Sequence, residues 1–253
     1  MAGAYIGTMG WSYDHWEGNF YPEDTGPAGY LSEYAKHFNS VEVNSTFYRI
    51  PRTTTVENWS RQTPDDFLFA VKFPRSLTHG RSLWDEPEKL EVFLGNIARL
   101  GAKLGPLLLQ FPAKFTAEDQ ETLGDFIQAL PEDHRYAVEF RHRSWFKEET
   151  QNMLRDLGVA LVQVDHPWMP KAEVVTSEFT YIRWQGDRRN ITGDKGRVER
   201  DRSQEIKKWT EKIHRLLEES VDIFGYFSKY YSGHPPTDAR QLLKVLHLER
   251  KKV

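Results

Sequence analysis

The chain alternates short apolar runs with longer amphipathic segments, and this alternation constrains its fold more than any other feature. Strand-like runs are expected at residues 5–8, 41–44, 67–72, 107–111, 136–140, 160–164, 179–184 and 223–227. Helices are expected between and after them, at residues 27–38, 56–61, 86–100, 117–130, 144–157, 200–219 and 237–248. The run 107–111 is almost wholly apolar, as in a parallel strand covered on both faces. The pattern predicts an α/β fold with a parallel sheet.

Roughly eight strand–helix units over this length predict a (β/α)8 barrel of the TIM type. We expect a single domain covering residues 1–253, because no segment has the composition of an interdomain linker. Residues 166–177 hold two prolines and no helical pattern, so the connection after the sixth strand is expected to be irregular. A doubly wound open sheet is the competing fold, but the first turn lacks a GxGxxG phosphate-binding sequence.

Composition narrows the classes of function. The absence of cysteine excludes disulfides, thiolate catalysis and cysteine-based metal sites. No apolar stretch reaches the roughly 20 residues of a membrane-spanning helix, and the N-terminus lacks a signal-peptide pattern, so a cytoplasmic protein without membrane association is expected. The formal charge of −3 gives no overall basic footprint for tight nonspecific binding to nucleic acid. The sequence does not specify an oligomeric state.

Polar side chains gather at the C-terminal ends of the expected strands, where barrels of this type build their sites. The alternation of inward and outward side chains predicts these inward positions: Thr8, Glu42, Lys72, Gln110, Glu139 with Arg141, Gln163 with Asp165, Arg183, and Tyr226 or Ser228. Three acids and three bases balance in this set, so a purely structural ion network is one interpretation. Buried ion pairs are seldom the most stable filling of a core, which favours a functional site.

Most of the eight tryptophans follow expected strands, namely Trp11, Trp16, Trp59, Trp84, Trp145, Trp168 and Trp184. Flat rings near a polar centre suit stacking on a sugar or a nucleobase. Alternatively, these rings are hydrophobic plugs that fix loops onto the rim, an interpretation that suits any one tryptophan better than the whole set.

Several motifs follow one another along the chain: Gly10-Trp11-Ser12-Tyr13-Asp14 with Trp16 and Phe20-Tyr21-Pro22, Val41-Glu42-Val43-Asn44-Ser45-Thr46-Phe47-Tyr48, Phe69-Ala70-Val71-Lys72, Thr78-His79, Leu109-Gln110-Phe111-Pro112, Val138-Glu139-Phe140-Arg141 with Ser144-Trp145, and Val164-Asp165. This ordered set closely resembles the YecE-like family, also called the domain of unknown function 72 family. The resemblance covers almost the whole chain and implies a TIM-type barrel, without an established activity. The chain departs from the family pattern at Gln185, where the family often has histidine, and at Ser228-Lys229, where paired asparagines are common.

Several chemistries compete at this predicted site. A divalent metal ion has oxygen and imidazole donors available from Glu42, His79, Glu139, His142, Asp165, His166 and His234. It is not favoured, because basic side chains already neutralise the carboxylates and no HxH or HExxH spacing occurs. Glycoside hydrolysis would use Glu42 and Glu139 as its carboxylate pair. The same basic neighbours would hold that pair ionised, which disfavours a general acid.

An anionic ligand is a further candidate, because the Gly- and Arg-rich loop 186–197 follows the seventh strand, where barrels often bind phosphate. With Arg183 and Lys229 this loop could clamp a phosphate, although acids interleave with its bases as in an ordinary solvated loop. A Schiff base at Lys72 is disfavoured, because adjacent carboxylates are expected to keep its amine protonated.

The sequence therefore predicts a pocket for a phosphorylated ligand with a flat ring, either a small nucleotide-like molecule or nucleic acid, and a hydrolytic or related acid–base step. Glu139 and Asp165 are the expected acid–base or metal-binding groups, and Glu42 is expected to orient them. The expected ligand-binding residues are Lys72, Arg141, Arg183, Trp11, Tyr13, Asn44, Tyr48, His79, Gln110 and Trp145. A non-catalytic binding or regulatory protein that uses the same pocket is the alternative.

Overall fold

The computed structural model describes residues 2–80 and 86–248, and it has an α/β architecture with two parallel sheets. The strands are β1 (Ala4–Thr8), β2 (Ser40–Val43), β3 (Leu68–Lys72), β4 (Leu104–Gln110), β5 (Tyr136–Glu139), β6 (Ala160–Leu161), β7 (Gln163–Asp165), β8 (Phe179–Trp184) and β9 (Asp222–Phe227). One sheet has the order β1-β9-β8-β7 and the other β2-β3-β4-β5-β6. The predicted α/β class and parallel pairing are confirmed.

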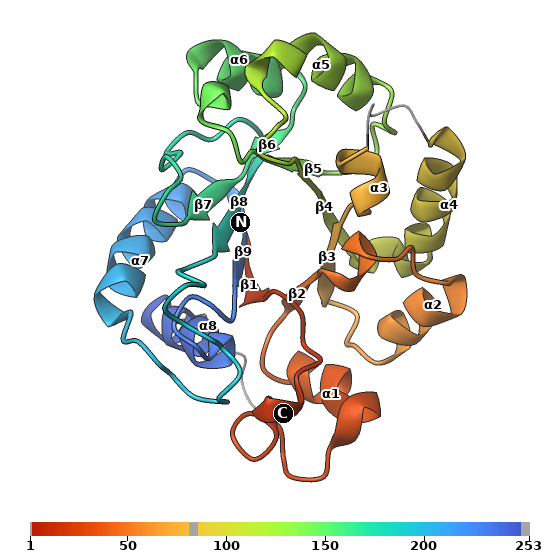
Figure 1. Ribbon diagram of the computed structural model, residues 1–253. Coiled ribbons are helices and arrows are strands. Elements are labelled where there is room, and N and C mark those ends of the chain that lie inside the picture. The colour runs from red at the N-terminus through yellow and green to blue at the C-terminus, as the bar shows by residue number, and fades with distance from the viewer. Residues whose placement is uncertain (1, 81–85, 249–253) are drawn as a thin grey trace.

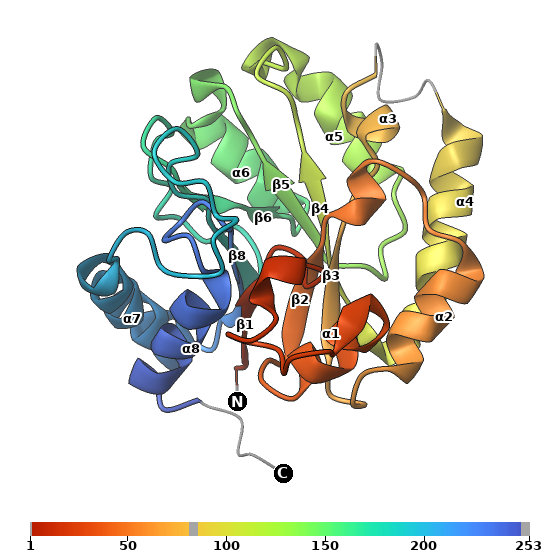
Figure 2. The same ribbon diagram turned by 60° about the horizontal axis from the view of Figure 1, so that its bottom comes forward.

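Helices cover the outside of both sheets. They are α1 (Gly26–Ala35), α2 (Thr53–Arg61), α3 (Arg75–Thr78), α4 (Pro87–Ile97), α5 (Gln120–Gln128), α6 (Glu148–Asp156), α7 (Ser203–Glu218) and α8 (Pro235–Val245). Figure 1 shows the strands following one another around a common centre with the longer helices outside them, and Figure 2 shows the same arrangement from a second direction. No helix within the described residues is both long enough and apolar enough to span a bilayer.

The hydrogen-bonded ladder is interrupted at two places, so the strands form two sheets and not the one closed sheet that we expected. Between β1 and β2 the link is a single bridge from Met9 to Glu42, with the Gly10 amide donating to the Glu42 carbonyl at 2.8 Å. The expected sixth strand is divided at Val162 into β6, which pairs with β5, and β7, which pairs with β8. The connection from β7 to β8 contains neither helix nor strand, as predicted.

Side chains that point to the centre of the strands form an inner apolar cluster, separate from the larger core between strands and helices. The inner cluster contains Ala70, Leu108, Ala137, Ala160, Val162, Val164, Phe179, Tyr181, Phe224 and Tyr226. At the C-terminal ends of the same strands the inward side chains are Glu42, Lys72, Gln110, Glu139 and Arg183. The inward orientation predicted for these five side chains agrees with the structure.

The inward orientation predicted for Gln163 and Asp165 is wrong. Because Val162 and Val164 belong to the inner cluster, the alternating residues Gln163 and Asp165 point outward towards the helices. Gln163 donates to Thr180 at 2.9 Å, and Asp165 accepts from the indole of Trp209 in α7 at 2.9 Å. A shift of one residue in the assumed phase of a strand exchanges its two faces, which explains the error.

The same error affects β1. Tyr5 and Met9 contact the inner cluster, whereas Thr8 faces α1, where its hydroxyl lies 3.1 Å from that of Tyr34. Met9 therefore takes the inward position at the end of β1 that we had expected for Thr8. The sulfur of Met9 accepts a hydrogen bond from Arg183 at 3.4 Å, which brings β1 into the polar site.

Candidate ligand-binding site

A cavity of about 350 Å³ opens at the C-terminal ends of the strands. Seven of the predicted ligand-binding residues line it: Tyr13, Asn44, Tyr48, Lys72, Gln110, Arg141 and Arg183. They come from the ends of β3, β4, β5 and β8 and from the loops after β1 and β2, so segments far apart in the sequence meet at one place.

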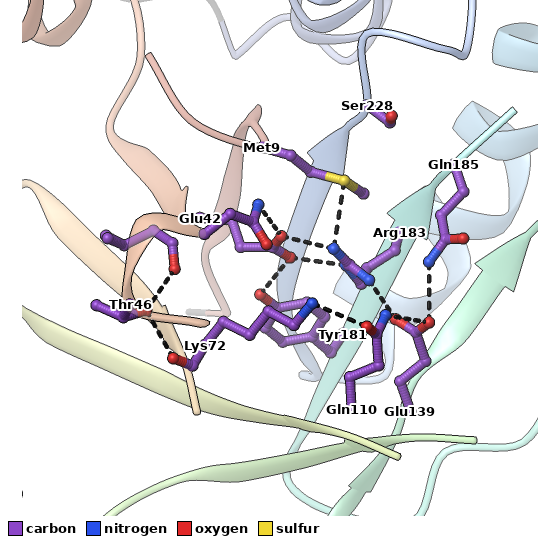
Figure 3. Close-up of polar contacts among 12 residues, drawn as sticks. Met9, Glu42, Thr46, Lys72, Gln110, Glu139, Tyr181, Arg183, Gln185 and Ser228 are labelled. Atoms are coloured by element: carbon purple, nitrogen blue, oxygen red, sulfur yellow. Dashed lines mark hydrogen bonds and ion pairs between the residues drawn. The ribbon is translucent and has the colours of Figure 1, made fainter. Parts of the chain in front are cut away.

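The guanidinium of Arg183 is the centre of the site, and it joins two buried carboxylates (Figure 3). Its Nε and one terminal nitrogen each donate to a different oxygen of Glu42 at 2.8 Å, a bidentate arrangement. Its other terminal nitrogen donates to Glu139. Arg183 is 4% exposed, and the two carboxylates together raise the pKa of its guanidinium although burial opposes them. One buried cation therefore holds two buried anions together.

Hydrogen bonds occupy both carboxylate oxygens of Glu42. Besides the bidentate contact with Arg183, its two oxygens accept from the Asn44 amide at 2.7 Å and from the Tyr181 hydroxyl at 2.9 Å. The side chain is fully buried and does not line the cavity. Glu42 has the inward position that we predicted, but it lies beneath the cavity and orients Arg183, not the predicted pair Glu139 and Asp165.

Hydrogen bonds also occupy both carboxylate oxygens of Glu139. One of its oxygens accepts from Arg183, and the other accepts from Gln110 at 2.7 Å and from Gln185 at 2.9 Å. Arg141 lies 3.7 Å from the same carboxylate. Burial raises the pKa of Glu139. The positive charges of Arg183, Arg141 and Lys72, in that order, outweigh burial and lower this pKa to about 2. A carboxyl group this acidic carries no proton at neutral pH, so Glu139 cannot serve as a general acid.

Lys72 lies at the bottom of the cavity beside Arg183. Unlike Arg183, it contacts no carboxylate among the described residues. Nζ donates to the amide oxygen of Gln110 at 2.8 Å and lies 3.9 Å from the centre of the Phe47 ring. Burial and then the charge of Arg183 lower the pKa of Lys72 to about 7, against the opposing pull of the two carboxylates. We had expected neighbouring carboxylates to keep this amine protonated, but Arg183 binds both of them and their pull does not offset burial.

Further basic side chains surround the mouth of the cavity. Arg141, Arg188 and Lys229 join Lys72 and Arg183 in its lining, and no Asp or Glu lines it among the described residues. The charge of this region also affects His79. Burial lowers the pKa of His79, and its basic neighbours, of which Lys72 has the largest effect, lower it further to about 4. The cavity therefore presents net positive charge to solvent, while both carboxylates lie sealed beneath it.

Aromatic rings line the cavity, but they are not tryptophans. Tyr13, Phe47, Tyr48 and Tyr230 lie in its wall, and Tyr48 is 83% exposed. Among the tryptophans expected near the site, Trp16, Trp145 and Trp184 are fully buried, Trp59 is nearly so, and Trp11 packs edge-on against Trp59. Trp168 is exposed, but it lies outside the lining and stacks with Arg189. Trp84 lies outside the described residues, and the described tryptophans act mainly as plugs.

Three predicted ligand-binding residues do not line the cavity. Trp11 packs against Trp59, Trp145 stacks on Phe140 and donates to the Phe115 carbonyl at 2.9 Å, and His79 bonds to Thr78. His79 also contacts the edge of Phe47, so it supports a lining residue.

Asp165, predicted as an acid–base partner of Glu139, belongs to a different part of the molecule. It lies in a separate cavity between β7 and α7, with Trp209 as its partner. The outward phase of β7 explains this placement, and it removes the predicted carboxylate pair. Within the described residues, no group of three or more histidine, aspartate or glutamate side chains is placed to hold a metal ion.

The lining residues missing from the predicted binding set come mostly from loops: Met9, Phe47, His166, Gln185, Gly186, Arg188, Ser228, Lys229 and Tyr230. Gly186 shows how these loops meet, because its φ is +68° and an added Cβ would lie 2.1 Å from the Tyr230 carbonyl oxygen. Only glycine allows the loops after β8 and β9 to approach this closely. Both departures from the family pattern, at Gln185 and at Ser228-Lys229, fall in the cavity lining.

Known proteins are similar to this chain in sequence or in architecture. A family model described as "Protein of unknown function DUF72" matches residues 5–253. The UPF0759 protein YecE of Escherichia coli K12 is 36% identical over 180 residues, which cover 68% of this chain and 64% of YecE, slightly less than two thirds of that relative. The UPF0759 protein YunF of Bacillus subtilis is 28% identical over 273 aligned positions, which cover 97% of this chain and 95% of YunF.

Solved structures agree with these sequence matches. A DUF72 family protein from Thermotoga maritima MSB8 superposes with a TM-score of 0.80 at 29% identity, covering 97% of this chain and 99% of the other. A DUF72 family protein from Enterococcus faecalis V583 has a TM-score of 0.79 at 24% identity, covering 97% and 96%, and supports the fold alone. The motif resemblance is thereby confirmed, and the chain belongs to the DUF72 family of proteins of unknown function.

Proposed function

We propose that the cavity at the C-terminal strand ends binds a small phosphorylated ligand that contains a ring, such as a nucleotide or a sugar phosphate. The observation that carries this proposal is the segregation of charge: five basic side chains line the cavity, and both carboxylates lie beneath it with their oxygens occupied. A dianionic phosphate gains from several cations at once, and arginine matches its geometry.

The ring of the ligand would lie against the tyrosines. Tyr48 exposes 83% of its surface at the rim, and it contacts Phe47 edge to face at 5.3 Å. A large aromatic side chain left open beside a charged cavity favours a planar or ring-shaped partner. A volume of about 350 Å³ lies at the lower end of the range for small-molecule pockets, so we favour a small ligand over a nucleic-acid chain.

Binding is the role that the geometry supports best, and the hydrolytic step expected from the sequence is not retained. Hydrolysis through a carboxylic acid needs a protonated group near neutral pH, whereas Glu139 has a pKa of about 2. Glycoside hydrolysis by Glu42 and Glu139 is also disfavoured, because both carboxylates bind one guanidinium and neither lines the cavity.

We also propose that the two sheets together form one TIM-type barrel domain over residues 1–253. The order of the strands around the centre in Figure 1 supports this, as does the bridge between Met9 and Glu42 that joins the sheets. A site at the C-terminal strand ends agrees with the usual location of sites in such barrels.

Removing a positive charge at the mouth of the cavity, from Arg188 or Lys229, should weaken binding of adenosine 5′-monophosphate. We expect Arg188→Gln and Lys229→Gln each to raise the Kd roughly tenfold, because a charge-assisted hydrogen bond contributes at least ~1.4 kcal/mol. Isothermal titration calorimetry measures the effect, with Arg155→Gln on the outer face of α6 as a charge-matched control expected to bind like the wild type. Unchanged affinity in both rim variants would contradict the proposal.

A further inference from the structure

The amine of Lys72 is buried, it is accessible from the cavity, and it has no carboxylate partner among the described residues. Lys72 is 6% exposed, yet it lines the cavity from the end of β3. Arg183 occupies both neighbouring carboxylates, and the hydrogen-bond acceptor of Nζ is the neutral amide oxygen of Gln110 at 2.8 Å. A buried ammonium that only served to balance charge would be expected to contact one of those carboxylates.

The position of the amine is set by a chain of directed hydrogen bonds. Glu139 can only accept, so Gln110 must turn its NH₂ group towards it at 2.7 Å. This fixes the amide oxygen of Gln110 towards Lys72, where it accepts from Nζ (Figure 3). On the other side Nζ lies against the face of Phe47 at 3.9 Å. The amine is therefore held in one place at the cavity floor.

This environment also sets the protonation of the amine. Burial is the larger cause and the charge of Arg183 the next, and together they bring the pKa of Lys72 to about 7. A substantial fraction of the side chain is then a neutral amine at neutral pH, which is the nucleophilic form. An exposed lysine with a pKa near 10.4 has only a trace of that form.

We infer that Lys72 is a covalent nucleophile that forms an imine with the carbonyl carbon of a phosphorylated aldehyde or ketone bound in the cavity. This inference rests on the proposed function and narrows the ligand to sugar phosphates whose ring opens to a carbonyl group. The lone pair of Nζ forms the C–N bond while the carbonyl π electrons move to oxygen. The carbinolamine then loses that oxygen with the two hydrogens of the amine as one water molecule. The basic rim, with Arg188 and Lys229, would hold the phosphate meanwhile.

Reductive trapping tests this inference on the intact protein. Incubation with ribose 5-phosphate and sodium cyanoborohydride should convert the imine to a stable secondary amine, which peptide mass spectrometry assigns to a residue. We expect the adduct on Lys72 at least tenfold above any other lysine, suppression by inorganic phosphate, and little reaction with ribose. Its rate should rise as the pH increases through about 7.

Variants separate a nucleophile from a simple cation. Lys72→Arg keeps the positive charge but cannot form an imine, so it should still bind ribose 5-phosphate and lose the adduct. Lys36→Arg, on the exposed end of α1, should label like the wild type. Wild-type protein that binds ribose 5-phosphate in calorimetry without acquiring a Lys72 adduct would overturn this inference and leave the proposed function intact. Failure to bind ribose 5-phosphate would overturn this inference, and failure to bind both ribose 5-phosphate and adenosine 5′-monophosphate would overturn the proposed function as well.

Discussion

Replacing Arg183 with methionine is expected to lower the free energy of unfolding by about 3–5 kcal/mol, because it leaves two buried carboxylates without their cation. Glu42 is fully buried and Glu139 is 2% exposed, so water cannot solvate either group in the folded protein. Methionine fills a similar volume, so the loss measures the missing charge and its hydrogen bonds more than a cavity. Urea denaturation at neutral pH gives the value directly.

Arg135→Met provides the matched control. Arg135 also makes an ion pair, with Asp222 at 3.3 Å, but its side chain is 46% exposed, so its loss should cost less than about 1 kcal/mol. A loss below about 1 kcal/mol for Arg183→Met would show that the carboxylates do not depend on this cation. Arg183 would then not be the cation that stabilises Glu42 and Glu139.

The second large effect is a dependence of stability on acid, which Glu139 should dominate. Its pKa is lowered from 4.5 to about 2 on folding, which corresponds to on the order of 3 kcal/mol of stability. Because the folded-state pKa is the lower one, this contribution is complete above pH 4.5 and is lost as the pH falls towards 2. Glu139→Gln should therefore be less stable than the wild type at neutral pH and lose less of its stability on acidification.

Denaturation curves between pH 5 and pH 2.5 compare the two proteins across the range set by these pKa values. Glu132→Gln, whose side chain is exposed in the turn after α5, should follow the wild type and corrects for the other carboxyl groups. Parallel pH profiles for the wild type and Glu139→Gln would contradict the strongly acidic character of Glu139. They would also remove the argument against Glu139 as a general acid.

The sequence was most informative where a strand shows clear alternation. In β2, β3, β4, β5 and β8 the polar residue at the end has the same phase as the small or apolar residues that fill the interior, so Glu42, Lys72, Gln110, Glu139 and Arg183 could be predicted together. In β6 and β7 apolar side chains occupy both phases, with Leu161 outward and Val162 and Val164 inward. Alternation then does not determine the facing of Asp165, and only packing against α7 does.

The mouth of the cavity could be predicted only in part. The sequence indicated the basic loop 186–197 and Lys229 as a possible phosphate clamp, but which of these side chains line the cavity depends on contacts between loops. Arg188, Lys229 and Tyr230 reach the cavity because the loops after β8 and β9 meet at Gly186. Nothing local distinguishes Arg188 from Arg189, which lies one residue further on and stacks over Trp168 at 4.0 Å. The predicted stacking role of the tryptophans could not be decided from sequence either. A large ring after a strand can pack a loop against the core as well as stack on a ligand.

Recognition of phosphate by this cavity can be measured by calorimetric titration of the wild-type protein with adenosine 5′-monophosphate and with adenosine. We expect saturable binding of the monophosphate that weakens as the salt concentration increases, because salt screens the attraction between the basic lining and the phosphate. We expect no measurable binding of adenosine under the same conditions. Equal affinity for the two compounds, or no binding of either adenosine 5′-monophosphate or ribose 5-phosphate at low salt, would contradict phosphate recognition by this cavity.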